Sequence, residues 1–479
     1  METQSAWKKI SEAETEKMES LAHDYISFIS ENKTERECVR SGIALAQAAG
    51  YKPLSEAVQQ QQLLVPGDKV WADAFGKALI LVQVGSDPII DGLRILGAHI
   101  DSPRLDIKQN PLFEANELAY LDTHYYGGIK HYQWVTLPLA MHGVVAKTDG
   151  SVVDIVIGEN PDDPVFCVTD LLIHLASAQM GKNAKEVVEG EALDILVGNK
   201  PLTITPDDNE EAGDGDAKEA KPKDAKEAVK AFALRWLEDV YGITEEDFLS
   251  AELEMVPAGS ARELGFDRSM VIGYGQDDKV CAYTSLVAQL SVAQEILPKT
   301  SVCVLVDKEE IGSVGATGMT SRFFENTMAR VAALLGYDHP YQVNALLAAS
   351  RMLSSDVSAG FDPAYASVFE AKNSAFLGHG LVFNKYTGAR GKSGSNDARA
   401  EYMAWIRGVM DNAEVAYQTA ELGRVDAGGG GTIAYIPAEY GMDVIDSGVA
   451  VLSMHSPWEV TRKVDIYEAE KGYEAFLRG

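Results

Sequence analysis

The chain has 479 residues, with 72 Asp and Glu against 42 Lys and Arg, which gives a formal net charge of −30 at pH 7. This acidic excess argues against a nucleic-acid partner, which needs a basic face for phosphates, and against docking on anionic membranes. We therefore expect neither partner. With 46% hydrophobic and 24% charged residues, the composition is typical of a globular protein with a large core and two domains.

The four cysteines lie far apart and form no C-x-x-C pair, so they indicate neither a zinc knuckle nor a disulfide framework. Free thiols in a reducing compartment are expected instead. The first twenty residues carry charges throughout and contain no apolar signal core, and no apolar run is long enough to span a bilayer. These features predict a cytoplasmic protein.

Residues from about 5 to 50 are predicted to form helices, because Leu21, Tyr25 and Phe28 recur at helical spacing among charged residues. A break between two helices is expected at Asn32 and Lys33. Two short apolar runs follow, over residues 79–84 and 93–99. Both predict strands of a buried sheet.

From about residue 104 to 243 the chain is rich in Tyr, Val and Thr, with runs such as residues 152–157. This composition predicts an inserted, β-rich domain. Within it, the acidic and Lys/Glu/Ala-rich segment near 206–228 cannot form a core and is expected to be a flexible surface loop. It does not match a calcium-binding loop, because the spacing is wrong and the terminal Glu of such a loop is missing.

Beyond the inserted domain, apolar strand-like and helical stretches alternate again. Residues 301–307 form the clearest buried strand, and helices are predicted over residues 282–297 and 397–422. This alternation predicts an α/β domain built from residues 1–103 and 244–479, with a central mixed sheet flanked by helices.

Candidate chemistry begins where the strand over residues 93–99 ends, in a His99-Ile-Asp101-Ser-Pro run. A histidine at such a point can present one ring nitrogen to a metal ion, and Asp101 lies close enough to orient the other. A structural histidine is the alternative.

Two adjacent carboxylates, Glu309 and Glu310, follow the strand over residues 301–307, in the region where α/β sheets collect ligands and catalytic groups. One can bind a metal while its neighbour acts as a base, although a charged loop would look the same. Asp277, between a glycine-rich turn and a helix, can bridge two ions or cap the helix.

Two further segments complete the set, since Asp356 follows an apolar stretch and His455 ends another apolar strand. Together the five segments supply nitrogen and oxygen ligands and a spare Glu. Zinc accepts such ligands, and a carboxylate shared by two ions is the arrangement found in two-metal hydrolases.

The sequence resembles the aspartyl aminopeptidase and vacuolar aminopeptidase I family of dinuclear zinc metallopeptidases. The resemblance covers nearly the whole chain, and its motifs occur in the family's order. They are His-Ile-Asp-Ser-Pro at 99–103, Gly-Gln-Asp-Asp-Lys-Val-Cys at 275–281, Glu-Glu-Ile-Gly-Ser at 309–313, Ser-Asp at 355–356 and Leu-Ser-Met-His-Ser at 452–456.

The resemblance implies an exopeptidase that removes the N-terminal residue of short peptides by attack of a metal-bound water. Glu309 would be the general base, and Asp101 would orient His99. The cofactor would be two divalent ions, with Zn²⁺ favoured and Co²⁺ or Mn²⁺ as the alternatives. The implied ligands are His99 and Asp356 for one ion, Glu310 and His455 for the other, and Asp277 as the bridge.

The resemblance further implies that the inserted domain over residues 104–243 drives dimerisation and covers the site. His174 would then enter the active site of a neighbouring subunit, while a histidine on an apolar helix face is the alternative. Family members also suggest a homo-oligomer in which dimers assemble into a tetrahedral dodecamer.

Lys385 falls where the family has a substrate-contacting lysine, but the segments after Lys385 and after His99 depart from the eukaryotic pattern. An acidic and a broad or neutral residue preference therefore both remain open. Two other functions compete with the aminopeptidase: an amidohydrolase that deacylates amino acids with the same metals, and a metal-free scaffold or peptide receptor.

Overall fold

The computed structural model describes residues 5–204, 223–224, 227–388 and 391–479. Most of the segment predicted as a flexible loop near 206–228 lies outside these residues. The chain divides into two compact units, Met1–Pro103 with Ser260–Gly479, and Arg104–Gly259. The second unit extends past residue 243, because strand β13 (Ala251–Pro257) pairs with β7 (Leu139–Ala146) inside it.

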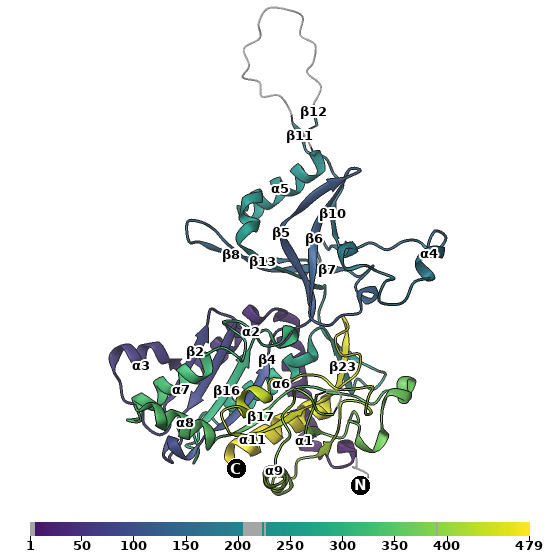
Figure 1. The fold of residues 1–479 in the computed structure, drawn as a ribbon. Coiled ribbons are helices and arrows are strands. Elements are labelled where there is room, and N and C mark those ends of the chain that lie inside the picture. The colour runs from purple at the N-terminus through teal and green to yellow at the C-terminus, as the bar shows by residue number, and fades with distance from the viewer. Residues whose placement is uncertain (1–4, 205–222, 225–226, 389–390) are drawn as a thin grey trace, which may run out of the picture. The chain divides into compact units, whose positions relative to one another are not determined.

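The first unit is built on a mixed sheet, which contains nine strands of the described residues (Figure 1). Its four central strands, β16, β4, β17 and β21, run parallel, and antiparallel pairs lie on both sides of them. In spatial order the strands are β1 (Lys52–Pro53), β2 (Lys69–Ala74), β3 (Ala78–Gln83), β16 (Ser301–Val306), β4 (Arg94–His99), β17 (Arg351–Ser354), β21 (Asp443–Gly448), β19 (Leu381–Asn384) and β20 (Tyr417–Thr419). The predicted α/β class with a central mixed sheet is confirmed.

Helices cover both faces of this sheet, so its central strands are apolar on both sides. Alternate residues of β3 show this, because Leu79 and Leu81 pack in one core cluster while Ile80 and Val82 pack in the other. The first face carries α1 (Glu12–Glu31), α2 (Glu35–Ala48), α6 (Gln276–Ser291), α9 (Ala400–Asn412) and α11 (Lys463–Arg478). The second carries α3 (Leu54–Gln60), α7 (Phe323–Leu334), α8 (Pro340–Ala348) and α10 (Tyr435–Ala438).

The predicted helix break at Asn32 is confirmed, and side-chain capping explains it. Asn32 ends α1, where its side-chain amide donates to the Phe28 carbonyl at 2.7 Å. Thr34 then begins α2 through a capping box with Glu37. The helix predicted over residues 397–422 is too long, since α9 ends at Asn412 and the chain enters the sheet as β20.

The second unit is an antiparallel sheet of seven strands within the described residues, against which α5 (Ala228–Tyr241) packs. Its strand order is β8 (Val152–Ile157), β7, β13, β5 (Arg104–Ala115), β6 (Leu118–Tyr126), β10 (Ile195–Gly198) and β9 (Cys167–Val168). The unit also contains α4 (Ser177–Met180) and the pair β11 (Thr203–Ile204) and β12 (Lys223–Asp224). It is the β-rich insertion that the composition predicts.

Two small sheets complete the first unit and position its loops. β14 (Arg262–Leu264), β15 (Met270–Gly273) and β23 (Glu459–Arg462) form one, and β18 (Ser358–Ala359) with β22 (Ala450–Val451) forms the other. Because Gly273 of β15 pairs with Glu459 of β23, the start of α6 and the loop before β23 lie close together.

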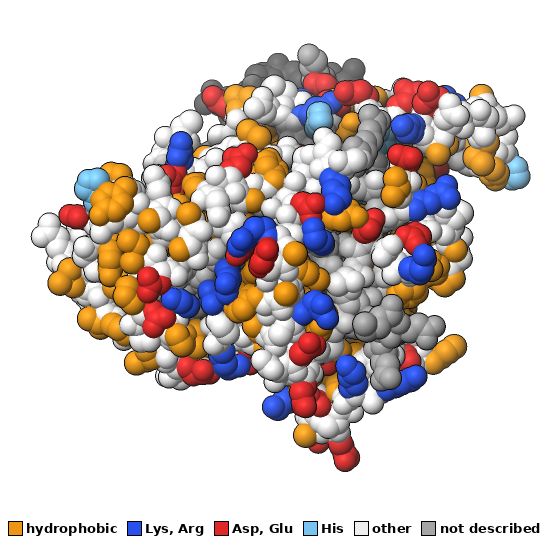
Figure 2. All heavy atoms as spheres, turned by 60° about the horizontal axis from the view of Figure 1, so that its bottom comes forward, with side chains coloured by type: hydrophobic (Ala, Val, Ile, Leu, Met, Phe, Trp, Pro, Cys, Tyr) orange, Lys and Arg blue, Asp and Glu red, His pale blue; other side chains and the backbone are white. Residues whose placement is uncertain are grey.

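On the face drawn in Figure 2, acidic and basic side chains are interspersed, with hydrophobic side chains scattered between them. A nucleic-acid-binding protein gathers its basic side chains on one face. Over the described residues that this view shows, basic side chains do not form such a patch. Across the ranges described above, no helix combines the length and apolar character that crossing a membrane requires.

Candidate active site

His99 is the last residue of β4, and its ring is oriented by the segment that follows it. The His99 Nδ1 atom lies 3.1 Å from the Asp101 carbonyl oxygen and 3.3 Å from Asp101 Oδ1. The two oxygens of the Asp101 carboxylate also accept the backbone N–H groups of Glu309 and Glu310, each at 3.1 Å. Asp101 therefore contacts both the imidazole of His99 and the backbone of Glu309 and Glu310, and fixes their relative positions.

Glu309 and Glu310 open a short 3₁₀ turn, Glu309–Ile311, which begins three residues after the end of β16. Since β16 and β4 are parallel neighbours, their carboxyl ends meet at one edge of the sheet, as is usual for sites in α/β folds. Glu309 Oε2 lies 3.9 Å from His99 Nε2, and Glu310 Oε2 lies 3.5 Å from His455 Nε2.

Asp277 stands between the two histidines, at the start of α6. Its Oδ1 is 3.3 Å from His99 Nε2, and its Oδ2 is 3.1 Å from His455 Nε2. Asp277 has a non-helical backbone and joins Asp278 through a cis peptide bond. The neighbouring Asp278 carboxylate accepts the backbone N–H of His99 at 3.4 Å.

The predicted ligands form overlapping groups of three residues. Within each group, one donor atom of each residue lies within 4.8 Å of the donor atoms of the other two. Asp277 belongs to two of these groups, one with each histidine. The groups are His99, Asp277 and Asp356; His99, Glu309 and Glu310; and Asp277, Glu310 and His455. The structure thus brings together all seven residues that the sequence singles out as ligands, base or His99 partner.

The cluster concentrates negative charge in a buried space. Burial would raise the pKa of Asp277, but its hydrogen bonds with His455 and His99 outweigh this and hold the pKa below its usual range. Burial, reinforced by the Asp277 charge, raises the pKa of Glu310 well above normal and that of Glu309 to about 7. Carboxylates crowded in this way favour the binding of cations.

Sequence reasoning missed Glu459, which is buried and touches two members of the cluster. One of its oxygens accepts the backbone N–H of Asp277 at 3.0 Å, and the other accepts that of His455 at 2.7 Å. The available signal was its position, four residues after His455 at the start of β23.

His174 belongs to none of these groups of donor atoms. His174 is exposed in the second unit, in a turn before α4 rather than on a helix face. Lys385 follows β19 and forms an ion pair with Asp397, which also pairs with Lys392 at 2.8 Å. Their predicted contacts with substrate stay predictions.

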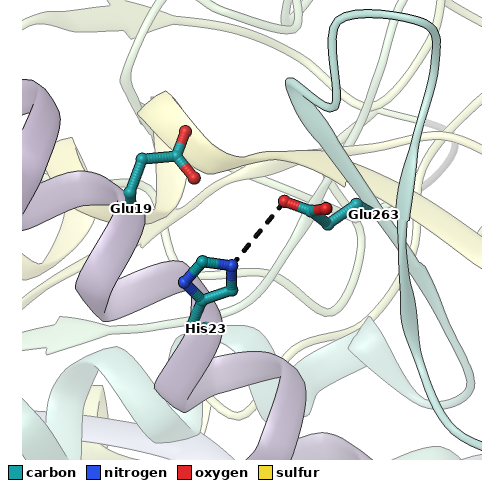
Figure 3. Close-up of side chains that lie close together, drawn as sticks. All are labelled: Glu19, His23 and Glu263. Atoms are coloured by element: carbon teal, nitrogen blue, oxygen red, sulfur yellow. Dashed lines mark ion pairs between the residues drawn. The ribbon is translucent and has the colours of Figure 1, made fainter.

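In a fourth group of possible ligands, the partly exposed side chains of Glu19, His23 and Glu263 lie close together in the first unit (Figure 3). His23 Nε2 is 3.8 Å from Glu263 Oε1. The ammonium group of the buried Lys463 already lies 2.5 Å from Glu19 and 2.6 Å from Glu263. Because the Lys463 ammonium already pairs with both carboxylates and offsets one of their two negative charges, this group is poorly suited to hold a divalent ion.

Replacing His23 by Ala should therefore leave the zinc content of the protein unchanged, whereas His455→Ala should lose zinc. Elemental analysis of the two dialysed variants beside the wild type measures this. A loss of zinc in the His23 variant would show that the group of Glu19, His23 and Glu263 binds metal.

Comparison with known proteins agrees with the geometry of the cluster. Residues 28–477 match the family model described as aminopeptidase I zinc metalloprotease (M18). The chain is 54% identical to a probable M18 family aminopeptidase 1 of Clostridium acetobutylicum, over 99% of this chain and 98% of that protein.

Solved structures show the same fold. A crystal structure of aminopeptidase I from Clostridium acetobutylicum is 52% identical, with a TM-score of 0.89 and full coverage of both chains. An M18 aminopeptidase from Thermotoga maritima is 41% identical, with a TM-score of 0.90 over 100% of this chain and 99% of that one. Together with the matched family model, these relatives show that the chain belongs to the M18 aminopeptidase I zinc metalloprotease family and is a zinc metallo-aminopeptidase, a hydrolase of peptide bonds.

Proposed function

We propose that the chain releases the N-terminal residue of short peptides at a centre of two zinc ions bound by the clustered side chains. The observation that carries the proposal is the position of Asp277, whose two oxygens face His99 on one side and His455 on the other. Asp356 would join His99 in binding one ion, and Glu310 would join His455 in binding the other. Asp277 would be a ligand of both ions.

The residues present fit zinc. The ligand set combines imidazole nitrogens with carboxylate oxygens, the donors that zinc accepts in hydrolases. Glu310 Oε1 is buried and has no hydrogen-bond partner among the described residues, so an acceptor is left for an ion to use. Zinc would supply Lewis-acid activation of water and of the scissile carbonyl, and its charge would lower the pKa of nearby carboxyls.

Glu309 is the proposed general base. It points at the cluster from the residue before Glu310, and its carboxylate lies 3.9 Å from His99 Nε2. It would take a proton from the attacking water and deliver that proton to the leaving amine. Asp101 would act as a positioning residue, because it holds both His99 and the backbone of Glu309.

The preferred N-terminal residue is the open part of this proposal. Lys385 is the candidate for contacting an acidic side chain, although its ammonium group is paired with Asp397. An acidic preference would require Lys385 to exchange that partner for substrate. A broad or neutral preference would leave the pair intact.

The experiment is a hydrolysis assay on a panel of aminoacyl amides with acidic, basic and apolar residues. The protein is first freed of metal by chelation, and zinc, cobalt or manganese is then added back. We expect release that depends on added metal, and the panel sets the residue preference. Cleavage of N-acylated amino acids alone would favour an amidohydrolase, and no release with any metal would favour a scaffold.

We further propose that the second unit mediates dimerisation and that twelve chains assemble. A structure of S. cerevisiae mApe1, described as a dodecamer, is 19% identical to this chain, with a TM-score of 0.74 over 95% of this chain and 96% of that one. Light scattering of the purified protein should give twelve times the mass of one chain. In such an assembly His174→Ala would lower activity without changing the mass, and a monomer would contradict the proposal.

A further inference from the structure

We propose that Glu459 is a positioning residue that holds Asp277 and His455 in place to bind metal. The inference rests on the proposed function, which makes these two residues ligands. Glu459 is 1% exposed, and its carboxylate reaches the backbone of both. One side chain thus connects the start of α6 with the loop that carries His455.

The contacts assign one oxygen to each partner. Glu459 Oε2 accepts the Asp277 N–H at 3.0 Å, and Glu459 Oε1 accepts the His455 N–H at 2.7 Å. A carboxylate can accept at both oxygens, whereas an amide of the same shape has one acceptor and one donor. With glutamine at this position, the side-chain NH₂ group would face the backbone N–H of either Asp277 or His455. Two donors cannot form a hydrogen bond, so one of the two contacts would be lost.

The backbone of Glu459 is fixed by its surroundings. Residue 459 pairs with Gly273 at the junction of β23 and β15. Its carbonyl oxygen accepts a hydrogen bond from the Gln276 side chain at 2.6 Å, and the same amide nitrogen donates to the Val271 carbonyl at 3.1 Å. The carboxylate therefore extends from a rigid support toward the cluster.

His455 depends on such support because its backbone is left-handed, with φ of 62°. A residue with a Cβ atom disfavours this conformation, and surrounding contacts must maintain it. The bond from its N–H to Glu459 is one of these contacts, and Ser456 N–H donating to the Ser453 carbonyl at 3.0 Å is another. Weakening the first should let the imidazole move away from the ion it binds.

The test measures zinc binding rather than turnover. Metal-free wild type and Glu459→Gln are titrated with Zn²⁺ against a chromophoric chelator of known affinity. Groups that orient metal ligands typically contribute roughly 10–100-fold to metal affinity. We expect at least one of the two ions to bind the variant more weakly by that factor.

Asp465→Asn is the matched control. Asp465 is also a buried carboxylate whose two oxygens accept backbone N–H groups, from Gly380 at 2.7 Å and Gly378 at 2.6 Å. Neither these partners nor the charged side chains that act on it, Arg462 and Glu468, belong to the cluster. The control should lower the thermal unfolding midpoint and leave zinc affinity unchanged.

The outcomes separate this inference from the function on which it rests. A wild type that binds two ions and a Glu459→Gln variant that binds them as tightly would overturn the role of Glu459 alone. An equal loss of affinity in the Asp465 control would also overturn it, by showing a general effect of destabilisation. A wild type that binds no zinc would overturn the proposed function as well. If circular dichroism shows that the glutamine variant is unfolded, Glu459→Asp, which keeps the charge but is shorter, replaces it under the same criteria.

Discussion

Glu309→Gln should lower kcat by roughly 10²–10⁴-fold, the range typical of a lost general base, while the protein still binds two zinc ions. Glutamine has nearly the shape of glutamate but cannot accept the proton of the attacking water. Steady-state kinetics on an aminoacyl amide, together with elemental analysis of the same sample, measures both quantities.

The control for this substitution is Glu295→Gln, which makes the same chemical change at a half-exposed glutamate paired with Arg478. It should leave kcat within about twofold of the wild type, since surface substitutions have small effects. If Glu309→Gln kept full activity, or lost its zinc, Glu309 would not be the base.

The same carboxylate predicts the direction of the pH dependence. Burial, followed by the charges of Asp277 and Asp101, raises the pKa of Glu309 to about 7. A base works only when ionised, so kcat/KM should rise with pH through the pKa of Glu309. Because bound cations lower that pKa, the acid limb should lie at or below about 7. A kcat/KM that falls steadily between pH 5 and 7 would contradict this.

Asp277→Asn is expected to weaken the binding of both metal ions, whereas a change at any other ligand should weaken the binding of one. Asp277 belongs both to the group with His99 and Asp356 and to the group with Glu310 and His455. Asparagine keeps one oxygen but replaces the other with an amide nitrogen, which cannot bind the second ion. The loss of zinc affinity should exceed the roughly 100-fold limit typical of groups that only orient ligands.

Asp356→Asn provides the comparison, because Asp356 belongs to one group of donor atoms with His99 and Asp277. Asp356→Asn should weaken the binding of one zinc ion and leave the binding of the other unchanged. Stoichiometric zinc titration of both variants resolves the two patterns. If Asp277→Asn weakened the binding of only one zinc ion, Asp277 would not be a ligand shared by both ions.

The fold and most of the site are predictable from sequence because the relevant signals are local. The strand over residues 79–84 corresponds to β3, whose residues are buried on both faces of the sheet, and such strands read as unbroken apolar runs. His99 is the last residue of one strand of this kind, and the pair Glu309 and Glu310 begins three residues after the end of another. A parallel arrangement brings those ends together, so the order of the motifs already indicates a common site.

What the sequence did not reveal depends on contacts between distant segments. Glu459 stands four residues after His455, but this spacing becomes informative only when β23 pairs with β15. The helix predicted over residues 397–422 ends early because residues 417–419 join the edge of the sheet beside β19. Both outcomes follow from sheet pairing, which has no local signature.

The most direct measurement for the two-metal centre is anomalous X-ray diffraction at the zinc absorption edge from crystals of the zinc-loaded protein. Two peaks should appear, one among His99, Asp277 and Asp356, and the other among Asp277, Glu310 and His455. A single peak, or zinc bound instead at Glu19, His23 and Glu263, would contradict the assignment of Asp277 as the ligand shared by two catalytic ions.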